Sequence, residues 1–254
     1  MQLRILGCSG GIGGANRTTS FLINDSILID AGTGVGDLSF TALTRVEHVF
    51  LTHTHLDHIA CLPMLVDTIM GSRNAPLTVY ATEITLNVLK KHIFNWAIWP
   101  DFNKIPNAKA PFMRYSILEL GQSCTIDQCT ITAIPAVHTV PAVGYQLDSG
   151  KNSVIFSGDS VCSPAFWDIV NATENLSHLI IETAFSNREY ELANAAKHFC
   201  PLTLLEQLKF LNRPAQVLVT HLKPADSELT MQEILRDHSN VTISRLEQSQ
   251  IITF

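Results

Sequence analysis

The side chains most suited to chemistry in this sequence are concentrated in residues 53–58. Three imidazoles and one carboxylate occur there within six residues, namely His53, His55, Asp57 and His58. Neutral imidazole and carboxylate are ligands that zinc, manganese and iron accept. In a loop after a strand, the first two histidines can point to one side while the aspartate and the third histidine turn to another. This arrangement predicts two neighbouring divalent ions, with zinc preferred and manganese or iron as alternatives.

Three further polar residues stand directly after apolar runs that are typical of buried strands. They are His138, Asp159 and His221, which follow residues 130–134, 154–158 and 217–220, respectively. Rigid β-structure can hold such side chains in fixed positions, and packing alone gives little reason for polar groups there. A hydrogen-bonded residue at a strand end is the ordinary alternative for each one taken singly. Together with residues 53–58, they complete the ligands that a two-ion site needs.

Asp30 follows the apolar run 27–29 and precedes a glycine-containing turn. A carboxylate in this place could accept a hydrogen bond from a metal-ligating histidine and so orient its ring. A turn-forming aspartate next to glycine is the competing explanation, and spacing alone favours it. The remaining histidines have no comparable context and are interpreted as surface or packing residues; they are His48, His92, His178 and His238.

The elements that must position these residues alternate along the chain. Strands are expected at residues 3–6, 20–29, 49–52, 77–80, 130–134, 142–147, 153–156, 179–182 and 217–220. Helices are expected at residues 59–70, 84–94, 189–198, 201–211 and 230–237. Strand-rich halves with interspersed helices predict an α/β (α+β) fold, a four-layer αββα sandwich.

Two loops raise further questions. The glycine-rich turn 7–14 superficially resembles a dinucleotide fingerprint, but a strand follows it where a helix would be needed. The loop 96–111 is rich in aromatic and apolar residues, including Trp99 and Phe102. It could form a wall of a substrate pocket, although packing onto the core is the more ordinary explanation.

Composition limits the class of protein. The chain has 254 residues, of which 46% are hydrophobic and 16% charged, so it can form a packed core and is not a disordered or fibrous protein. No repeat or linker divides it, which predicts one domain over residues 1–254. No apolar run is long enough to span a bilayer, and the N-terminus has no signal-peptide pattern, so a cytoplasmic location is expected.

The charge balance limits the partners. A formal net charge of −6 argues against broad binding to nucleic-acid phosphates, which relies on clustered Lys and Arg. A small anionic substrate drawn in by metal ions is compatible with it. The six cysteines contain no CxxC pair, so a zinc ribbon or thioredoxin-type centre is not expected. A homodimer is left open.

The run at residues 53–58 resembles the HxHxDH signature of the metallo-β-lactamase superfamily. Asp30, His138, Asp159 and His221 resemble, in that order, its first-motif aspartate, third-motif ligand, bridging carboxylate and last ligand. Within the superfamily the likeness is greatest to the class II 3′,5′-cyclic-nucleotide phosphodiesterases. Its supporting stretches are residues 6–11, 30–34, 52–59, 138–145, 181–187 and 219–224.

This resemblance implies roles for individual residues. One ion would be held by His53, His55 and His138, the other by Asp57, His58 and His221, with Asp159 as the bridge. The expected reaction is attack by a di-metal-activated hydroxide on the phosphorus of cyclic AMP or cyclic GMP, which gives a 5′-nucleotide.

The resemblance also implies a proton donor. His198 resembles the histidine that ribonuclease Z and related phosphodiesterases supply to the leaving group, and Glu182 would orient it. With Asp57, these two complete the catalytic candidates. The plain alternative is that Glu182 caps the following segment while His198 ends a helix favourably.

Other functions compete with this hypothesis. A ribonuclease Z-like enzyme that processes transfer-RNA precursors would share the ligands and the Glu–His pair, but the sequence contains no Lys/Arg-rich insertion to clasp RNA. A thioester or lactone hydrolase of the same fold would use Trp99 and Phe102 to line an acyl pocket. A metal-binding module without catalysis would not need the pair formed by Glu182 and His198.

Overall fold

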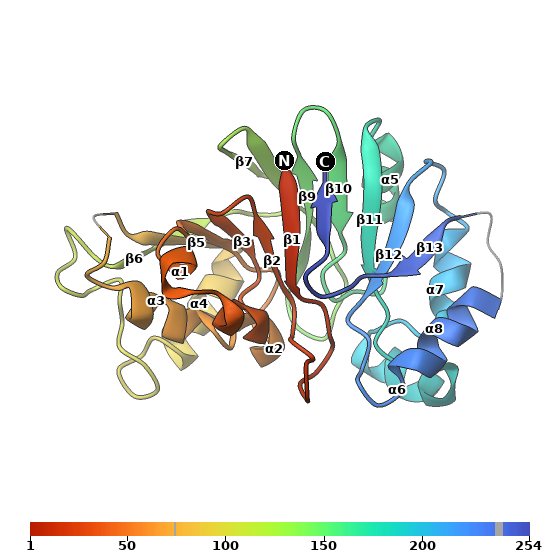
Figure 1. The fold of residues 1–254 in the computed structure, drawn as a ribbon, viewed down its shortest axis with the longest axis horizontal. Helices are drawn as coiled ribbons and strands as arrows, with labels where there is room; N and C mark the ends of the chain where they lie inside the picture. Colours follow the sequence, from red (N-terminus) through yellow and green to blue (C-terminus); the bar gives the residue numbers. More distant parts are fainter. Residues whose placement is uncertain (74, 237–240) are drawn as a thin grey trace.

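A computed structural model describes residues 1–73, 75–236 and 241–254 of the chain. Within these residues two seven-stranded sheets face each other (Figure 1). The first sheet contains, in spatial order, β14 (Ile251–Thr253), β1 (Gln2–Gly7), β2 (Ser20–Ile23), β3 (Ile27–Ile29), β4 (His48–Phe50), β5 (Leu77–Ala81) and β6 (Met113–Ile117). The second contains β13 (Ile243–Arg245), β12 (Gln216–Thr220), β11 (Leu176–Glu182), β10 (Ser153–Phe156), β9 (Val143–Asp148), β8 (Cys129–Pro135) and β7 (Ser123–Ile126).

Helices cover the outer side of each sheet (Figure 1). Those of the first half are η1 (Thr33–Asp37), α1 (Phe40–Leu43), α2 (Leu56–Ile59), α3 (Leu62–Ile69) and α4 (Glu83–His92). Those of the second half are α5 (Pro164–Ala172), η2 (Asn187–Glu189), α6 (Tyr190–Ala196), α7 (Pro201–Leu208) and α8 (Ser227–Arg236). None of the described helices is long and apolar enough to cross a membrane. The predicted four-layer αββα sandwich is confirmed.

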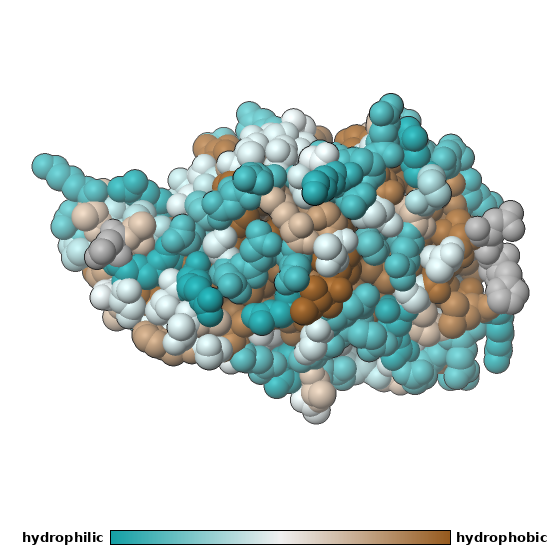
Figure 2. Space-filling view, turned by 45° about the horizontal axis from the view of Figure 1, so that its top comes forward, coloured by the Kyte–Doolittle hydropathy of each residue, from teal (hydrophilic) through white to brown (hydrophobic). Residues whose placement is uncertain are grey.

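Three apolar clusters hold these layers together. One lies between the sheets, where Phe21 meets the edge of Phe156 with ring centroids 4.9 Å apart. The other two lie between each sheet and its helices and include Leu65 and Leu204, respectively. Burying a side chain of this size contributes about 1.5–3 kcal/mol. The view in Figure 2 shows a mainly hydrophilic surface on which apolar residues form small separate patches.

The two ends of the described chain pair with each other. Strands β1 and β14 are antiparallel neighbours, with Gln2 opposite Thr253, and the N-terminal ammonium of Met1 donates to the carbonyl oxygen of Phe254 at 2.7 Å. The first and last strands therefore belong to one sheet. We keep a single domain over residues 1–254 as a proposal, which this pairing supports.

Several element boundaries differ from the sequence prediction. The run 20–29 is two antiparallel strands, because Asn24 adopts a left-handed conformation (φ 49°) in a turn between β2 and β3. The helix expected at 59–70 corresponds to α3, while Ile59 is the last residue of the separate short helix α2. Helix α5 was not predicted, although Ser163 accepts a hydrogen bond from the amide of Phe166 as an N-cap. Residue 237, the expected end of the last helix, lies outside the described residues.

Four strands were also missed. Strands β6, β7, β13 and β14 are short or lie at or next to a sheet edge, and their sequences lack a continuous apolar run. Only residues such as Met113, Cys129 and Ile252 on or beside these edges reach full burial. Alternation over three to five residues is too short a pattern to identify such strands reliably.

The aromatic loop 96–111 packs against the protein core. Phe102 is 1% exposed and belongs to the cluster beneath the helices of the first half. The indole Nε1 of Trp99 donates to the carbonyl oxygen of Pro63 at 3.1 Å. The core-packing explanation of these two aromatic residues therefore fits the structure, with Phe102 fully buried and Trp99 partly buried against the same cluster.

Candidate metal centre

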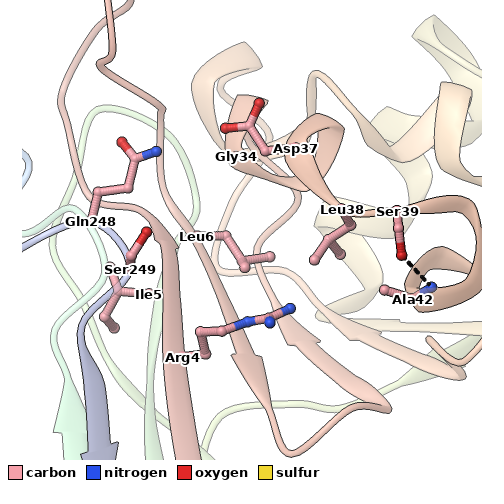
Figure 3. Close-up of a pocket in the computed structure, with 10 residues that line it drawn as sticks. All are labelled: Arg4, Ile5, Leu6, Gly34, Asp37, Leu38, Ser39, Ala42, Gln248 and Ser249. Atoms are coloured by element: carbon pink, nitrogen blue, oxygen red, sulfur yellow. Dashed lines mark hydrogen bonds between the residues drawn. The ribbon is translucent and has the colours of Figure 1, made fainter.

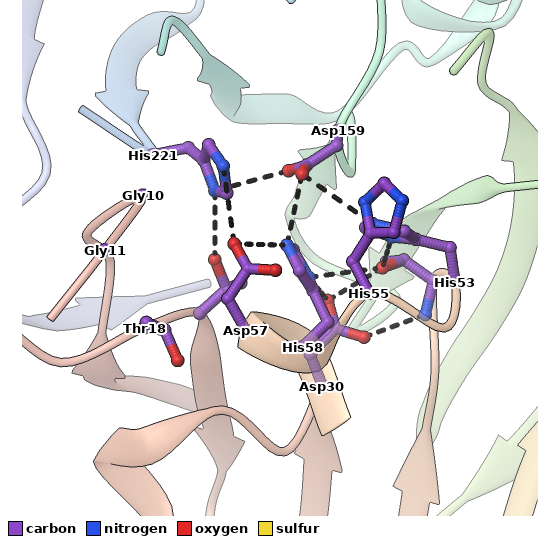
Figure 4. Close-up of polar contacts among 12 residues, drawn as sticks. Gly10, Gly11, Thr18, Asp30, His53, His55, Asp57, His58, Asp159 and His221 are labelled. Atoms are coloured by element: carbon purple, nitrogen blue, oxygen red, sulfur yellow. Dashed lines mark hydrogen bonds and ion pairs between the residues drawn. The ribbon is translucent and has the colours of Figure 1, made fainter. Parts of the chain in front are cut away.

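The ligand-type side chains come from loops at one end of the two sheets. His53 and His55 follow β4, and Asp57 and His58 lie on the short helix α2. The remaining three follow β8, β10 and β12 and are His138, Asp159 and His221, respectively. Carboxyl ends of parallel neighbouring strands meet at one edge of a sheet, so residues distant in sequence converge here (Figure 4).

The seven predicted residues form two groups that share Asp159. In each group the candidate ligand atoms lie within 4.8 Å of one another, the first being His53, His55, His138 and Asp159 and the second Asp57, His58, Asp159 and His221. Oδ2 of Asp159 is 3.2 Å from Nε2 of His58 and 3.7 Å from Nε2 of His53. Its Oδ1 is 3.3 Å from Nδ1 of His221. The structure thus brings together all the residues that were predicted to surround two ions.

Several atoms of this cluster have charged or polar neighbours but no well-formed hydrogen bond within the described residues. Nε2 of His53, Nε2 of His58 and Oδ1 of Asp159 are buried and have no hydrogen bond to the described residues. Buried polar atoms are nearly always satisfied, so each unpartnered atom calls for a ligand. Imidazole nitrogens and carboxylate oxygens arranged around a common point suit a divalent cation such as zinc. The residues present therefore fit a metal centre.

Charge states in the cluster also suit metal binding. Burial lowers the pKa of His53 well below its usual value, that of His138 to about 4 and that of His221 to about 3. Burial alone would raise the pKa of Asp159, but the charges of His221 and His58 outweigh it and hold this pKa well below its usual value. The three imidazoles are therefore neutral near pH 7 while Asp159 is ionised, which are the forms that bind cations.

Asp30 orients His58 from behind. Its Oδ2 lies 2.7 Å from Nδ1 of His58 and also accepts the hydroxyl of Thr52 at 2.8 Å. Its Oδ1 accepts the backbone N–H of Thr52 at 2.8 Å. With Nδ1–H directed at this carboxylate, Nε2 of His58 faces the cluster as the atom that would bind a cation. Burial lowers the pKa of His58, but attraction to Asp159 and Asp30 outweighs it and raises this pKa well above its usual value, so a bound cation would displace the Nε2 proton. Asp30 also has a left-handed backbone (φ 57°) directly after β3, so the turn-forming interpretation fits the structure as well, and the same residue both turns the chain and contacts His58.

Thr52 is a residue that the sequence interpretation missed. It is fully buried between Asp30 and the histidines, and its hydroxyl is also 3.0 Å from Nδ1 of His53. The available signal was its place between the apolar run of β4 and His53, where a polar residue has little packing value.

The glycine-rich turn supports the last ligand. His221 has a left-handed backbone (φ 64°), and its N–H donates to the carbonyl oxygen of Cys8 at 2.8 Å. A Cβ atom at Gly10 would lie 2.3 Å from the carbonyl oxygen of His221, so only glycine allows this approach. The turn therefore packs against the metal centre, and β2 follows it where a dinucleotide site would need a helix.

Glu182 and His198 form a buried pair beside the cluster. Oε1 of Glu182 is 2.8 Å from Nδ1 of His198 and accepts the N–H of Ser160 at 3.2 Å. The His198 ring lies 4.8 Å from that of His138 and 5.3 Å from that of His221, measured between centroids. Burial lowers the pKa of His198, but attraction to Glu182 outweighs it, so this pKa is raised. Burial raises the pKa of Glu182.

The plain alternative for this pair is met only in part, because the N–H of His198 donates to the carbonyl oxygen of Ala193 at 2.9 Å and so closes the end of α6, while its ring faces Glu182. Helix α6 ends at Ala196, and Lys197 turns into a left-handed conformation (φ 53°), so His198 lies beyond the helix. Glu182 is the last residue of β11 and directs Oε1 at His198. His48, His92 and His178 lie on other elements, away from the cluster, and His238 lies outside the described residues.

Comparisons with known proteins agree with this geometry. A family model described as a β-lactamase superfamily domain matches residues 25–222. A probable 3′,5′-cyclic-nucleotide phosphodiesterase of Yersinia pestis is 25% identical, in an alignment that covers 87% of this chain and 77% of that protein. The structure of unliganded yeast PDE1 shares the fold with a TM-score of 0.79, at 20% identity over 98% of each chain.

Ribonucleases Z are also among the similar proteins. A ribonuclease Z of Clostridium beijerinckii is 32% identical over 155 residues. That alignment covers 57% of this chain and 48% of the ribonuclease, so about half of that enzyme has no counterpart in the match. This match therefore shows similarity only within the aligned 155 residues.

Proposed function

Because the chain belongs to the β-lactamase superfamily and has the metallo-β-lactamase fold, we propose that it is a metal-dependent phosphodiesterase that hydrolyses 3′,5′-cyclic nucleotides to 5′-nucleotides. The observation that carries this proposal is the pair of ligand groups sharing Asp159, with Glu182 and His198 beside them. Cleavage of a phosphodiester requires a site that activates a water molecule and a separate group that protonates the leaving oxygen.

Each side chain has a defined task in this proposal. His53, His55 and His138 would hold one cation and Asp57, His58 and His221 the other, and Asp159 belongs to both groups. Two divalent cations bound there would supply an acidified water and neutralise negative charge on the phosphoryl oxygens. The neutral imidazoles of His53, His138 and His221 and the ionised Asp159 are in the forms that bind cations at neutral pH.

His198 supplies the proton for the leaving 3′-oxygen. Glu182 holds Nδ1 of the ring at 2.8 Å, which leaves Nε2 to act on the substrate. Because the pKa of His198 is raised by this carboxylate, the imidazolium is available near neutral pH. The general-acid assignment therefore depends on the pair and not on His198 alone.

The choice of substrate follows from charge and from the relatives. A formal net charge of −6 favours a small nucleotide over a long RNA, whose phosphates need clustered cations. The phosphodiesterase of Yersinia pestis is 25% identical to this chain over 87% of its length, which supports the same choice. Transfer-RNA processing is the second candidate, because the ribonuclease is the more identical of the two over its stretch. A cytoplasmic location and a homodimer also remain proposals.

A hydrolysis panel tests the proposal directly. Protein with measured metal content is incubated with bis(p-nitrophenyl) phosphate, cyclic AMP, cyclic GMP and a transfer-RNA precursor. We expect turnover of the model diester and of at least one cyclic nucleotide, with no cleavage of the RNA. Cleavage of the precursor with no turnover of either cyclic nucleotide would replace this function by the second candidate. Inactivity of fully metal-loaded protein on all four substrates would reject both.

A further inference from the structure

A polar cavity lies on the outer side of the first sheet, and its lining residues are separate from the candidate metal ligands. It is bounded by β1, by η1 and α1, and by the turn before β14 (Figure 3). Leu3 and Ile5 face the core between the sheets, so Arg4 between them points outward into this cavity. Its volume is about 260 Å³, and none of the candidate metal ligands contributes to its wall.

Arg4 has no counterion among residues 1–73, 75–236 and 241–254. Its Nε is buried without a hydrogen-bond partner, and no ion pair to its guanidinium is found in that part of the chain. The carboxylate of Asp37 also borders the cavity, but its Oδ2 lies 2.9 Å from Nε of Arg17. A buried N–H of a guanidinium costs free energy unless an acceptor meets it, and an anion meets both this N–H and the positive charge.

Neutral donors lie on the opposite walls of the cavity. Oγ of Ser39 accepts the N–H of Ala42 at 3.2 Å, which leaves the hydroxyl hydrogen free to donate inward. Gln248 contributes a side-chain amide from the turn before β14. The next residue, Ser249, has a left-handed backbone (φ 68°) and donates its N–H to the carbonyl oxygen of Ile5 at 2.7 Å. This strained turn is thereby fixed against β1.

We propose that this cavity binds a small oxyanion, a phosphoryl or carboxylate group, with Arg4 as its charge partner and Ser39 and Gln248 as neutral donors. The planar fork of a guanidinium matches two oxygens of either group. Gly34 keeps the wall in place, because a Cβ there would lie 2.4 Å from the carbonyl oxygen of Leu6. The cavity is larger than an oxyanion alone requires, so the ligand carries this group on a small molecule.

Nuclear magnetic resonance of the full-length, metal-loaded protein tests the site. Inorganic phosphate and acetate are titrated separately while backbone amide shifts are followed. We expect saturable shifts at Ser39, Ala42 and Ser249 with at least one of these anions. The variant Arg4→Gln should weaken this binding about tenfold or more, since a charge-assisted hydrogen bond is lost. Its metal content and its turnover of bis(p-nitrophenyl) phosphate should stay at the wild-type level.

Two further variants make the result decisive. Arg114→Gln removes the same charge from the exposed face of β6 and should bind the anion as tightly as the wild type. Ala42→Glu places a carboxylate in the cavity wall and should abolish anion binding while Arg4 is retained, which covers the case in which Arg4→Gln does not fold. Shifts confined to residues around the metal ligands, or equal affinity in the wild type and Ala42→Glu, would overturn the proposal.

Discussion

Replacing Asp30 with asparagine isolates the contribution of a residue that touches no proposed substrate or ion. The carboxylate receives three donors: the N–H and hydroxyl of Thr52 and Nδ1–H of His58. An amide offers one oxygen and one NH₂ group in the same shape. In Asp30→Asn, at least one of these donors must therefore face another donor in a fully buried place.

Two orientations of the amide are available, and each has a cost. If the NH₂ group faces His58, Nδ1 must accept a hydrogen bond, so the proton moves to Nε2 and blocks the atom that faces the cluster. If the NH₂ group faces the N–H of Thr52 instead, two buried donors face each other without an acceptor, which costs about 1–3 kcal/mol. We expect metal affinity to fall about 10–100-fold, which corresponds to about 1.4–2.7 kcal/mol.

Competition with a chromogenic chelator measures the affinity of the wild type and Asp30→Asn for zinc. The matched control is Asp37→Asn, because that carboxylate is about half exposed and pairs with Arg17 on the surface. The control should bind zinc as the wild type does. An Asp30→Asn protein that is folded and binds zinc with unchanged affinity would refute the idea that Asp30 fixes the tautomer of His58.

The other predictions concern single steps of the same argument. His198→Ala should lower turnover of a phosphodiester about 10²–10⁴-fold with metal content unchanged, and equal loss of both would remove His198 from catalysis. Asp159→Ala should instead lose bound metal, as measured by elemental analysis, because both ligand groups share this carboxylate. Gly10→Ala should reduce both the melting temperature and zinc affinity, since its Cβ would lie 2.3 Å from the backbone of His221; wild-type values for both would contradict this steric reasoning.

The sequence was most informative where ligands are close together or follow strong apolar runs. Residues 53–58 indicate a metal site locally, and His138, Asp159 and His221 follow shortly after the ends of β8, β10 and β12. The predicted superfamily is confirmed by the family match over residues 25–222. Strands such as β4 and β12 were recognisable because both of their faces are buried, whereas the short edge strands depend on neighbours that no local pattern reveals.

Asp30 shows where local reasoning reaches its limit. A turn-forming aspartate and an aspartate that orients a histidine have the same flanking sequence, including the glycine at position 32. The two roles differ only in what lies opposite the carboxylate, and Thr52 and His58 come from the next strand and its following helix. Since β3 and β4 are parallel neighbours, this contact is a consequence of sheet order. Sheet order is not encoded within any one segment.

The glycine-rich turn after β1 and Arg4 within β1 also depend on contacts that their own sequence segment does not reveal. After β1, the absence of a side chain at Gly10 allows the backbone of His221 to approach closely. Gly10 therefore supports a candidate metal ligand more than 200 residues away in the sequence. Within β1, Arg4 occupies an outward position of a strand whose inward neighbours are fully buried, and nothing in the sequence distinguishes it from a solvated surface arginine. Only the covering by η1 and α1 turns that charge into an unpaired one. Charges on partly covered sheet faces are therefore worth testing for ligands even when no motif surrounds them.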